Sequence, residues 1–257
     1  DRGLGNGISL IIMVGIIARL PFALFAEAAQ RMGQTNGGPL MFIIEIVILF
    51  LIFIATIALV QGQRKVPVQY AKRIIGNKQY GGVRQYIPLK INAAGVMPII
   101  FAQALMMFPM LLAGFDATQG LAATLSDYTG FWYNFIFAFL VGIFTFFYTA
   151  ITVNPTMMAD EMKKNGGFIP GVKPGKKTAD YLDAIMSRIT LPGSVFLAIV
   201  AILPAFAMMF GINNQFAQFY GGTSLLILVG VVLDTLQQIE SHLLMRHYDG
   251  LMKTGRL

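Results

Sequence analysis

The chain has 257 residues, of which 56% are hydrophobic and only 12% are charged. A soluble domain usually carries about twice that charged fraction, so the composition excludes an ordinary soluble protein and favours a membrane protein. The chain contains no cysteine, which excludes disulfides, thiolate metal sites and cysteine nucleophiles. The net charge of +7 is compatible with a nucleic-acid partner, but membrane proteins also concentrate Lys and Arg in their cytosolic loops.

Six apolar segments follow one another along the chain, and runs of about 20 apolar residues match a hydrocarbon core about 30 Å thick. The segments cover residues 8–25, 40–60, 91–112, 131–153, 189–210 and 223–244. The sequence therefore predicts an all-α fold, a polytopic transmembrane helical bundle that forms a single membrane domain over residues 1–257.

The positive charges indicate which connections share one side of the membrane. Of the 19 Lys and Arg residues, 17 lie in the two termini and the two long polar loops, which are residues 1–7, 245–257, 61–90 and 154–188. The other two, Arg19 and Arg31, are assigned to the opposite side, near the first turn. The positive-inside rule then predicts that both termini and both long loops are cytosolic, and the basic balance needs no nucleic acid to explain it.

The apolar segments contain prolines that a simple membrane anchor does not need. Proline in a span frees a carbonyl group and kinks the helix, which is tolerated where neighbouring groups satisfy the backbone. The positions concerned are Pro21, Pro98, Pro109, Pro192 and Pro204. They favour bent helices arranged around a cavity.

The first long loop, residues 61–90, has the pattern of a protruding hairpin. Residues 66–70 alternate between apolar and polar, and residues 83–87 form a second candidate strand. Glycine-containing pairs at 76–77 and 81–82 supply turns. Pro67 is expected to restrict the first strand to the edge of a sheet, because proline lacks the backbone donor that a central strand uses.

The second long loop, residues 154–188, is predicted to contain two helices. Asn154 is a good N-cap for a short helix that ends at Lys164. An extended, turn-rich tip then exposes Lys173. Thr178 is expected to cap the next helix, whose apolar residues recur at helical spacing and continue into the fifth span.

Motifs that could carry chemistry are few. The glycine-rich stretch at residues 3–7 resembles a phosphate-binding turn, but it follows no strand and opens a membrane helix. Asp234 lies inside the last span and Glu45 near the start of the second. An acid in a span suggests a functional site, so Asp234 is either a hydrogen-bonded interior residue or part of a proton relay. With no HExxH, no GxSxG and no pair of intramembrane aspartates, we expect no enzyme activity, no cofactor and no metal.

Six stretches, spread over essentially the whole chain, resemble the SecY family, the pore subunits of the bacterial Sec protein translocase. In chain order they are GLGNGISLII, QGQRKVPVQYAKR, PLKINAAGVMPIIFA, FFYTAITVNP, ADEMKKNGGFIPGVKPGKKTADYLD and FYGGTSLLILVGVVLD. The family has ten spans in two pseudo-symmetric halves, and this chain matches only the last six. It starts with DRGLGNG rather than Met and shows no cleavable signal peptide, so we expect a fragment.

The resemblance implies a multi-pass, protein-conducting channel in the bacterial cytoplasmic (inner) membrane. Such a channel moves unfolded secretory polypeptides across the membrane and releases membrane segments into it. The pore would be closed by an apolar ring, and the matching positions here are Ile8, Ile12, Ile100 and Ile227. Ile8 and Ile12 are four residues apart and share a helix face, and an apolar constriction can block ions by dewetting. Without the resemblance, each would be read as an ordinary packing or lipid-facing isoleucine.

The resemblance also implies a lateral gate that opens between the two halves, formed on one side by the third and fourth spans. Pro98 would bend the third span near the constriction. Gln103 and Phe108 are the candidates for the lining of the gate. An amide in an apolar helix needs a polar partner, so Gln103 faces either the pore or a neighbouring helix.

The two basic loops would dock the cytosolic motor SecA or the ribosome, while SecE and SecG would be the small membrane subunits. The nascent polypeptide, its signal sequence and the lipid bilayer complete the implied partners. The docking candidates are Arg64, Lys65, Lys72, Arg73 and Lys173; their alternative role is that of a solvated cytosolic loop. This chain has Lys173 where the family commonly has Arg, and Asn77-Lys78 where a basic pair is common. Lysine lacks the bidentate fork of arginine.

Two other classes of function remain open at this point. A secondary transporter with a polar site at the midplane would also use broken helices and an acid such as Asp234. A structural membrane scaffold would tolerate changes in both basic loops.

Overall fold

The structure is a computed structural model, and it describes residues 7–33, 38–70, 73–75, 78–80, 84–108, 124–125 and 127–254. The chain divides into two compact units. Unit 1 comprises Asp1–Ile57 and Leu203–Leu257, and unit 2 comprises Ala58–Ile202. Each unit has its own cluster of buried apolar side chains.

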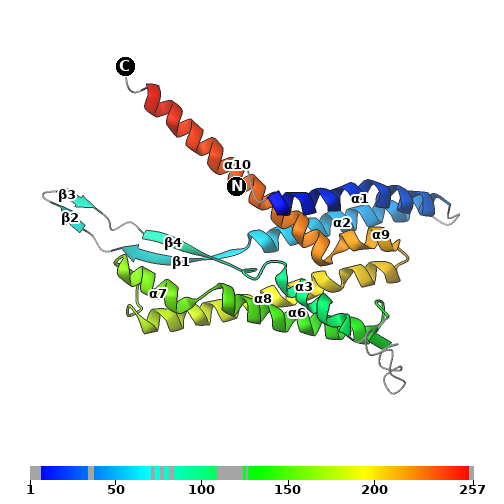
Figure 1. Cartoon of the computed structure of the whole chain (residues 1–257), viewed down its shortest axis with the longest axis horizontal. Helices are drawn as coiled ribbons and strands as arrows, with labels where there is room; N and C mark the ends of the chain where they lie inside the picture. The colour runs from blue at the N-terminus through cyan, green and yellow to red at the C-terminus, as the bar shows by residue number, and fades with distance from the viewer. Residues whose placement is uncertain are drawn as a thin grey trace. The chain divides into compact units, whose positions relative to one another are not determined.

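Three long helices make up most of unit 1: α1 (Gly7–Met32), α2 (Gly38–Gln61, whose last turn belongs to unit 2) and α10 (Gly222–Thr254) (Figure 1). α2 carries a single charged residue, Glu45, and a helix that is apolar on all sides is suited to the interior of a bilayer. Pro21 lies inside α1 without ending it.

The core of unit 1 is built where a short connection folds back onto α1 and α2. This connection contains α9 (Asn214–Ala217) and the 3₁₀ helix η3 (Gln218–Tyr220). It buries Phe216 and Tyr220, whose rings meet edge to face with centroids 5.5 Å apart. Small residues, including Ala23 on α1, leave room for these rings.

Among the described residues, the main helices of unit 2 are α3 (Met97–Met106), α6 (Phe131–Thr152), α7 (Pro155–Lys164) and the first part of α8 (Lys176–Met209). α3 packs against α6 through aromatic side chains. The ring of Phe101 lies 5.3 Å from that of Tyr148 and 6.1 Å from that of Phe144, measured between centroids.

Unit 2 also contains a small antiparallel sheet with the order β4-β1-β5 (Figure 1). β1 (Gln63–Tyr70) pairs with β4 (Arg84–Lys90), which confirms the hairpin predicted for the first long loop. β5 (Gly167–Phe168) comes from the second long loop. A separate pair, β2 (Arg73–Ile75) with β3 (Lys78–Tyr80), lies between β1 and β4 in the chain; the predicted turn pairs at 76–77 and 81–82 lie outside the described residues.

The prediction that Pro67 restricts its strand to a sheet edge was wrong, because β1 is the central strand of the three. Pro67 is paired with Tyr86 of β4, whereas β5 pairs only with Gln69 and Tyr70. At Pro67 itself β1 therefore has a neighbouring strand on one side only. The backbone N–H that proline lacks is not needed for pairing with a second strand there.

The two predicted helices of the second long loop are present, with one correction. Asn154 caps α7 as expected, its Oδ1 accepting from the backbone N–H groups of Thr156 (3.1 Å) and Met157 (3.3 Å). α8 is continuous from Lys176 into the apolar segment, also as expected. Thr178 is not its N-cap, because the helix starts two residues earlier; its hydroxyl instead donates to the carbonyl oxygen of Lys173 at 3.0 Å.

Within the described residues, five helical stretches are long and apolar enough to cross a membrane: Gly7–Met32, Gly38–Gln61, Phe131–Lys164, Lys176–Met209 and Gly222–Leu244. They overlap five of the six predicted spans. The remaining one, residues 91–112, contains the shorter helix α3 and ends outside the described residues. The fold is therefore the predicted all-α, multi-pass type, while six crossings in one membrane domain stay a prediction.

Candidate functional site

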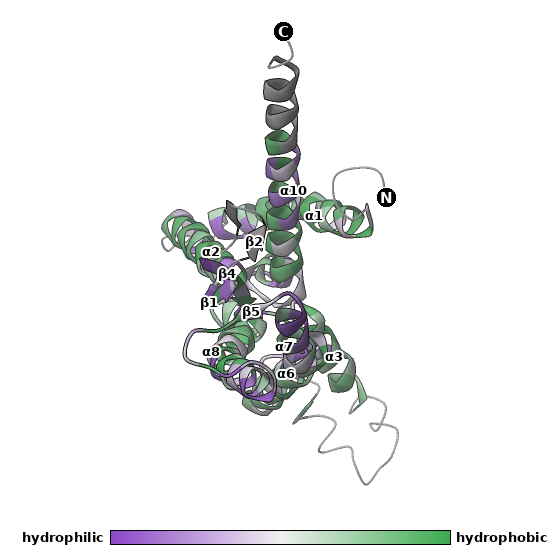
Figure 2. Cartoon of the chain, turned by 90° about the vertical axis from the view of Figure 1, so that its left-hand side faces the viewer, coloured by the Kyte–Doolittle hydropathy of each residue, from purple (hydrophilic) through white to green (hydrophobic). Residues whose placement is uncertain are grey.

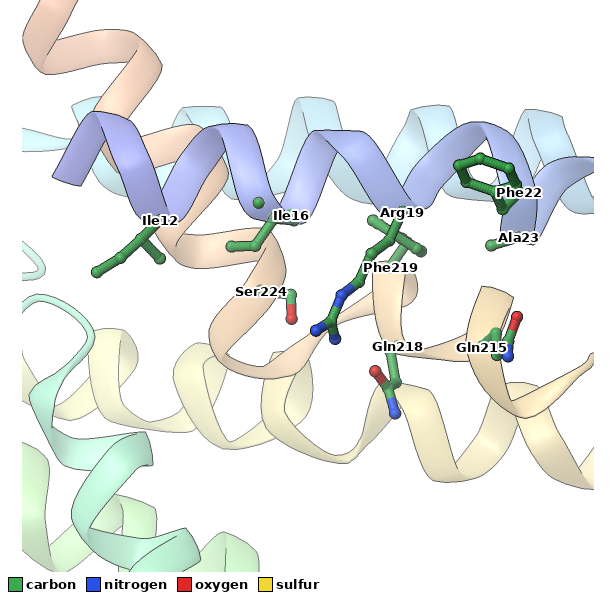
Figure 3. Close-up of a pocket in the computed structure, with 10 residues that line it drawn as sticks. Ile12, Ile16, Arg19, Phe22, Ala23, Gln215, Gln218, Phe219 and Ser224 are labelled. Carbon is green, nitrogen blue, oxygen red and sulfur yellow. The ribbon is translucent and has the colours of Figure 1, made fainter. Parts of the chain in front are cut away.

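A cavity of about 670 Å³ lies within unit 1, between one face of α1 and the segment formed by α9, η3 and the start of α10 (Figure 3). Its α1 residues recur every three or four positions, so they form a single stripe along the helix. They are Ile12, Gly15, Ile16, Arg19, Phe22 and Ala23. The opposite wall is made by Gln215, Gln218, Phe219 and Ser224.

Arg19 makes this cavity partly polar. It is the thirteenth of the 26 residues of α1, so the assignment of Arg19 to a connection near the first turn was wrong. Figure 3 shows its side chain extending toward Ser224 and Gln218. Arginine facing lipid at the centre of a span costs about 2.5–3.5 kcal/mol on insertion scales, so a position beside a polar cavity is favourable. The sequence alone could have indicated Arg19 as a site residue, because an ionisable residue inside an apolar run suggests a functional site.

The four predicted ring residues fall in both units. Ile8 and Ile12 lie on α1 and Ile227 on α10, two helices of unit 1 that pack against each other. Ile12 lines the cavity, Ile8 is 71% exposed and Ile227 is half-buried. Ile100 is partly exposed on α3 of unit 2. The structure thus confirms the shared helix face of Ile8 and Ile12, and the ring itself stays a prediction.

Two of the gate candidates, Pro98 and Gln103, lie in α3, and the third, Phe108, lies two residues after its end. Pro98 is the second residue of α3, where proline needs no intrahelical donor, so the expected bend at Pro98 is not found. Gln103 is exposed and makes no hydrogen bond to another residue in the described part of the chain. Phe108 is 60% exposed. The position of Gln103 does not support a satisfied amide between helices.

A buried charge cluster, formed by Glu27, Arg31 and Glu45, joins α1 to α2. Arg31 Nε donates to Glu27 Oε1 at 2.9 Å, and Arg31 Nη2 lies 2.5 Å from Glu45 Oε1. All three side chains are at least nine-tenths buried. Glu45 Oε2 is buried and has no hydrogen-bond partner among the described residues. Arg31 is therefore an interior residue of a helix end and not part of an exposed connection.

The charge cluster also holds the connection that carries α9 and η3. The backbone N–H of Asn213 donates to Glu27 Oε2 at 2.8 Å, and the hydroxyl of Tyr220 donates to the backbone oxygen of Glu45 at 2.8 Å. Burial raises the pKa of Tyr220, so its phenol remains a neutral donor. Glu27, Arg31 and Glu45 thus link the consecutive helices α1 and α2 to a connection that lies more than 150 residues further along the chain.

Asp234 does not have the interior position that its span suggested. Its side chain is exposed on α10 and makes no hydrogen bond to another described residue. The described residues also contain no group of three His, Cys, Asp or Glu side chains that could hold a metal ion. The structure therefore adds no support to a proton relay through Asp234.

The two polar loops of unit 2 pack against each other and form what we call the basic platform: β1, β4, β5, α7 and residues 169–188. Its core joins Val66, Val68 and Leu89 from the first loop to four residues of the second. These four are Met162, Ile169, Leu182 and Met186. The sequence predicted each loop separately, and nothing in it indicated that they share one core.

The surface of the basic platform is strongly positive. Among its described residues, ten Lys and Arg side chains are exposed against four Asp and Glu, and none of the ten forms an ion pair. The ten are Arg64, Lys65, Arg84, Lys90, Lys163, Lys164, Lys173, Lys176, Lys177 and Arg188. Figure 2 shows hydrophilic residues gathered on α7 and β1, in contrast to the apolar α1.

The docking candidates are distributed over this platform. Arg64 and Lys65 are exposed on β1, next to the buried Val66. Lys173 is exposed as predicted, and its carbonyl oxygen is held by the hydroxyl of Thr178. Lys72 lies outside the described residues, and Arg73 is in β2 with a side chain that also lies outside the described part.

The helices, the partly polar cavity and the basic platform define a multi-pass, mostly helical membrane protein with a candidate site in each of its units. Its family follows from comparison with known proteins. The family model SecY matches residues 1–236, and the chain belongs to the SecY family, which confirms the resemblance seen in the sequence.

Relatives and solved structures agree with this membership. The protein translocase subunit SecY of Mycobacterium tuberculosis is 44% identical, in a match that covers 98% of this chain and 59% of the relative. The SecY subunit of Streptomyces coelicolor is also 44% identical, in a match that covers 98% of this chain and 58% of the relative. That of Chlamydia trachomatis is 43% identical, over 100% of this chain and 58% of the relative. The chain thus spans about three fifths of the length of these relatives.

Two solved structures resemble the fold. One is a SecY protein whose plug domain stabilises the closed state of the translocation channel; its TM-score is 0.57 at 18% identity, over 93% of this chain and 60% of that chain. The other is a protein-conducting channel, with a TM-score of 0.56 at 17% identity, over 93% and 59%. At these identities the likeness bears on the fold alone.

Proposed function

We propose that this chain supplies the C-terminal part of a protein-conducting channel. The channel moves unfolded secretory polypeptides across the bacterial cytoplasmic membrane and releases membrane segments into the lipid. The observation that carries the proposal is membership of the SecY family along nearly the whole chain, with relatives named as translocase subunits. The alternative of a secondary transporter finds no support in those relatives, and none in the exposed Asp234.

In this proposal the stripe on α1 faces the path of the polypeptide. Ile8 and Ile12 are its apolar constriction, together with Ile227 and Ile100. An apolar ring hinders ions because it loses water easily, yet it gives way to a passing chain. The partly polar cavity beside Ile12 supports this role, because the stripe carries an arginine and faces a wall with two glutamines, whereas a surface that faces lipid is apolar. Pro98, Gln103 and Phe108 then belong to the lateral gate.

The basic platform is proposed to face the cytosol, together with both termini of the chain, and to dock SecA or the ribosome. Ten unpaired positive side chains on a surface with four acids support an acidic protein partner or RNA phosphate. The apolar core beneath Lys173 and Lys65 keeps these charges in a fixed arrangement. SecE and SecG are the expected partners within the membrane.

Cysteine cross-linking tests the channel directly, because the chain has no cysteine of its own. In the complete translocase, with a mild thiol oxidant added, Ile12→Cys and Ile100→Cys should each form a disulfide with a cysteine in a stalled secretory polypeptide. Val14→Cys is the matched control, since it lies almost opposite Ile12 around α1 and is also exposed. Equal cross-linking at Val14 and Ile12, or none at Ile12 and Ile100, would contradict the channel function.

A further inference from the structure

The cavity beside α1 has a net positive charge that nothing in the described part of the chain neutralises. Arg19 forms no ion pair and no hydrogen bond with a described residue. The other polar residues that line the cavity, Gln215, Gln218 and Ser224, are all neutral. Arg19 is exposed, so an anion brought from outside this unit can reach its guanidinium group.

The three neutral side chains suit an anionic oxygen group. Amide nitrogens and a hydroxyl can each donate a hydrogen bond to such a group, while the guanidinium offers two parallel N–H donors. Figure 3 shows Arg19 extending from α1 toward the wall that carries Ser224 and Gln218. Gly15 leaves that wall open, because a Cβ atom there would meet nothing within 4 Å. The donor set fits a carboxylate or a phosphate.

The depth of Arg19 distinguishes these two sources. Twelve residues separate Arg19 from the start of α1 and thirteen from its end, which places it about 18–20 Å from either end of the helix. Lipid phosphates lie at the surface of a hydrocarbon core about 30 Å thick. A polypeptide that passes along the stripe comes close to Arg19 at this depth, whereas a lipid headgroup has to leave the interface.

We propose that the Arg19 cavity binds carboxylate side chains of the polypeptide in transit. Arg19 follows Ile12 by seven residues on the same stripe, which is about 10 Å along the helix. An acidic residue on one side of the proposed constriction therefore meets a positive charge and neutral donors, and a basic residue meets repulsion. The proposal rests on the proposed channel function, since it names the chemistry of what the channel holds beside the constriction.

The test uses Ser224→Cys, a nearly isosteric change that places the only thiol of the chain in the cavity. Stalled polypeptides in the complete translocase carry one cysteine flanked by Glu, Gln or Lys. We expect disulfide formation about tenfold faster with Glu than with Gln, which corresponds to about 1.4 kcal/mol. The preference should persist in Arg19→Lys, vanish in Arg19→Gln and turn toward Lys in Arg19→Glu. Comparing Glu with Gln within each variant cancels any effect of Arg19 on the reactivity of the introduced thiol.

The outcomes separate the two proposals. If Ile12→Cys cross-links but the Glu preference is the same with and without Arg19, the carboxylate site is wrong and the channel stands. If neither Ile12→Cys nor Ser224→Cys reaches any stalled polypeptide, the channel function itself fails. A Glu preference lost on raising the fraction of phosphatidylglycerol in phosphatidylcholine vesicles would assign the cavity to a lipid phosphate and overturn the assignment to polypeptide.

Discussion

The charge cluster of unit 1 and the basic platform of unit 2 use charged side chains in opposite ways. In the charge cluster, Glu27, Arg31 and Glu45 are buried, paired and bonded to three segments of the chain. In the basic platform the charges are exposed and unpaired, and apolar side chains beneath them hold the segments together. The cluster is therefore suited to maintaining the fold, while the platform is free to bind a partner.

The largest effect should come from breaking the charge cluster. Arg31→Ala leaves two buried carboxylates without a cation, and loss of one member of a buried pair costs about 3–5 kcal/mol. We expect a matching decrease in the free energy of unfolding, measured by thermal or chemical unfolding of the complete protein in detergent. Lys173→Ala, which removes an exposed and unpaired charge, should change it by less than about 0.5 kcal/mol.

A rescue variant shows whether the uncompensated charge is the cause. Adding Glu27→Gln and Glu45→Gln to Arg31→Ala removes both negative charges but keeps side chains that can accept hydrogen bonds. Most of the lost stability should return. If the triple variant is as unstable as Arg31→Ala, the packing of the Arg31 side chain and not its charge holds the cluster together.

The second effect should come from the core of the basic platform. Leu182 is fully buried between the two loops, and Leu→Ala in a core costs about 2–5 kcal/mol. Leu182→Ala should increase the hydrogen exchange of backbone amides in β1 without changing any charge. Leu191→Ala is the matched control on the same helix, because Leu191 is 58% exposed. Unchanged exchange in β1 would mean that the loops do not depend on each other.

The third effect concerns binding and not stability. If Lys173 contacts an acidic partner, Lys173→Glu should weaken the affinity for SecA about tenfold, which is about 1.4 kcal/mol, and the loss should shrink at high salt. Lys173→Arg should bind at least as well as the native chain, since arginine adds a bidentate fork. Lys177→Glu makes the same charge change four residues away. An equal loss in both Glu variants would indicate net charge and not a contact at Lys173.

The sequence predicted most of the fold because its strongest signals are local. Long apolar runs gave five of the spans, and Asn154 gave the start of α7 through a hydrogen-bonding pattern confined to three residues. The prediction for Thr178 was wrong because the start of α8 depends on the turn at Gly175, where φ is +97°. Glycine adopts this positive φ readily, so the extended tip ends at Gly175 and the helix begins two residues before Thr178.

The features that sequence reasoning missed are those that join distant segments. The pairing of Gln69 with Phe168 brings the two loops into one sheet, and the bond from Asn213 to Glu27 spans 186 residues. Alternation and helical periodicity describe one element at a time, so neither could show these contacts. Arg19 is different, because its position inside an apolar run was visible, and it was misassigned only by counting it as part of a connection.

The smallest effect should come from Asp127, a carboxylate that is neither buried nor paired with a cation. Its Oδ1 accepts hydrogen bonds from the hydroxyl (2.7 Å) and the backbone N–H (3.0 Å) of Thr129, ahead of α6. These bonds, led by the hydroxyl, lower the pKa of Asp127 below its usual value. Because the folded pKa is the lower one, the stabilisation is complete above the ordinary pKa of aspartate and is lost as the pH falls through the folded value.

Hydrogen exchange at the Thr129 amide can measure this local effect. At neutral pH, Asp127→Ala should reduce its protection, and the difference from the native chain should disappear as the pH falls below the usual range of aspartate. Asp127→Asn keeps an oxygen acceptor without a titrating group, so its protection should stay independent of pH. If the Asn variant followed the native pH profile, a group other than Asp127 would be responsible for the protection of the Thr129 amide.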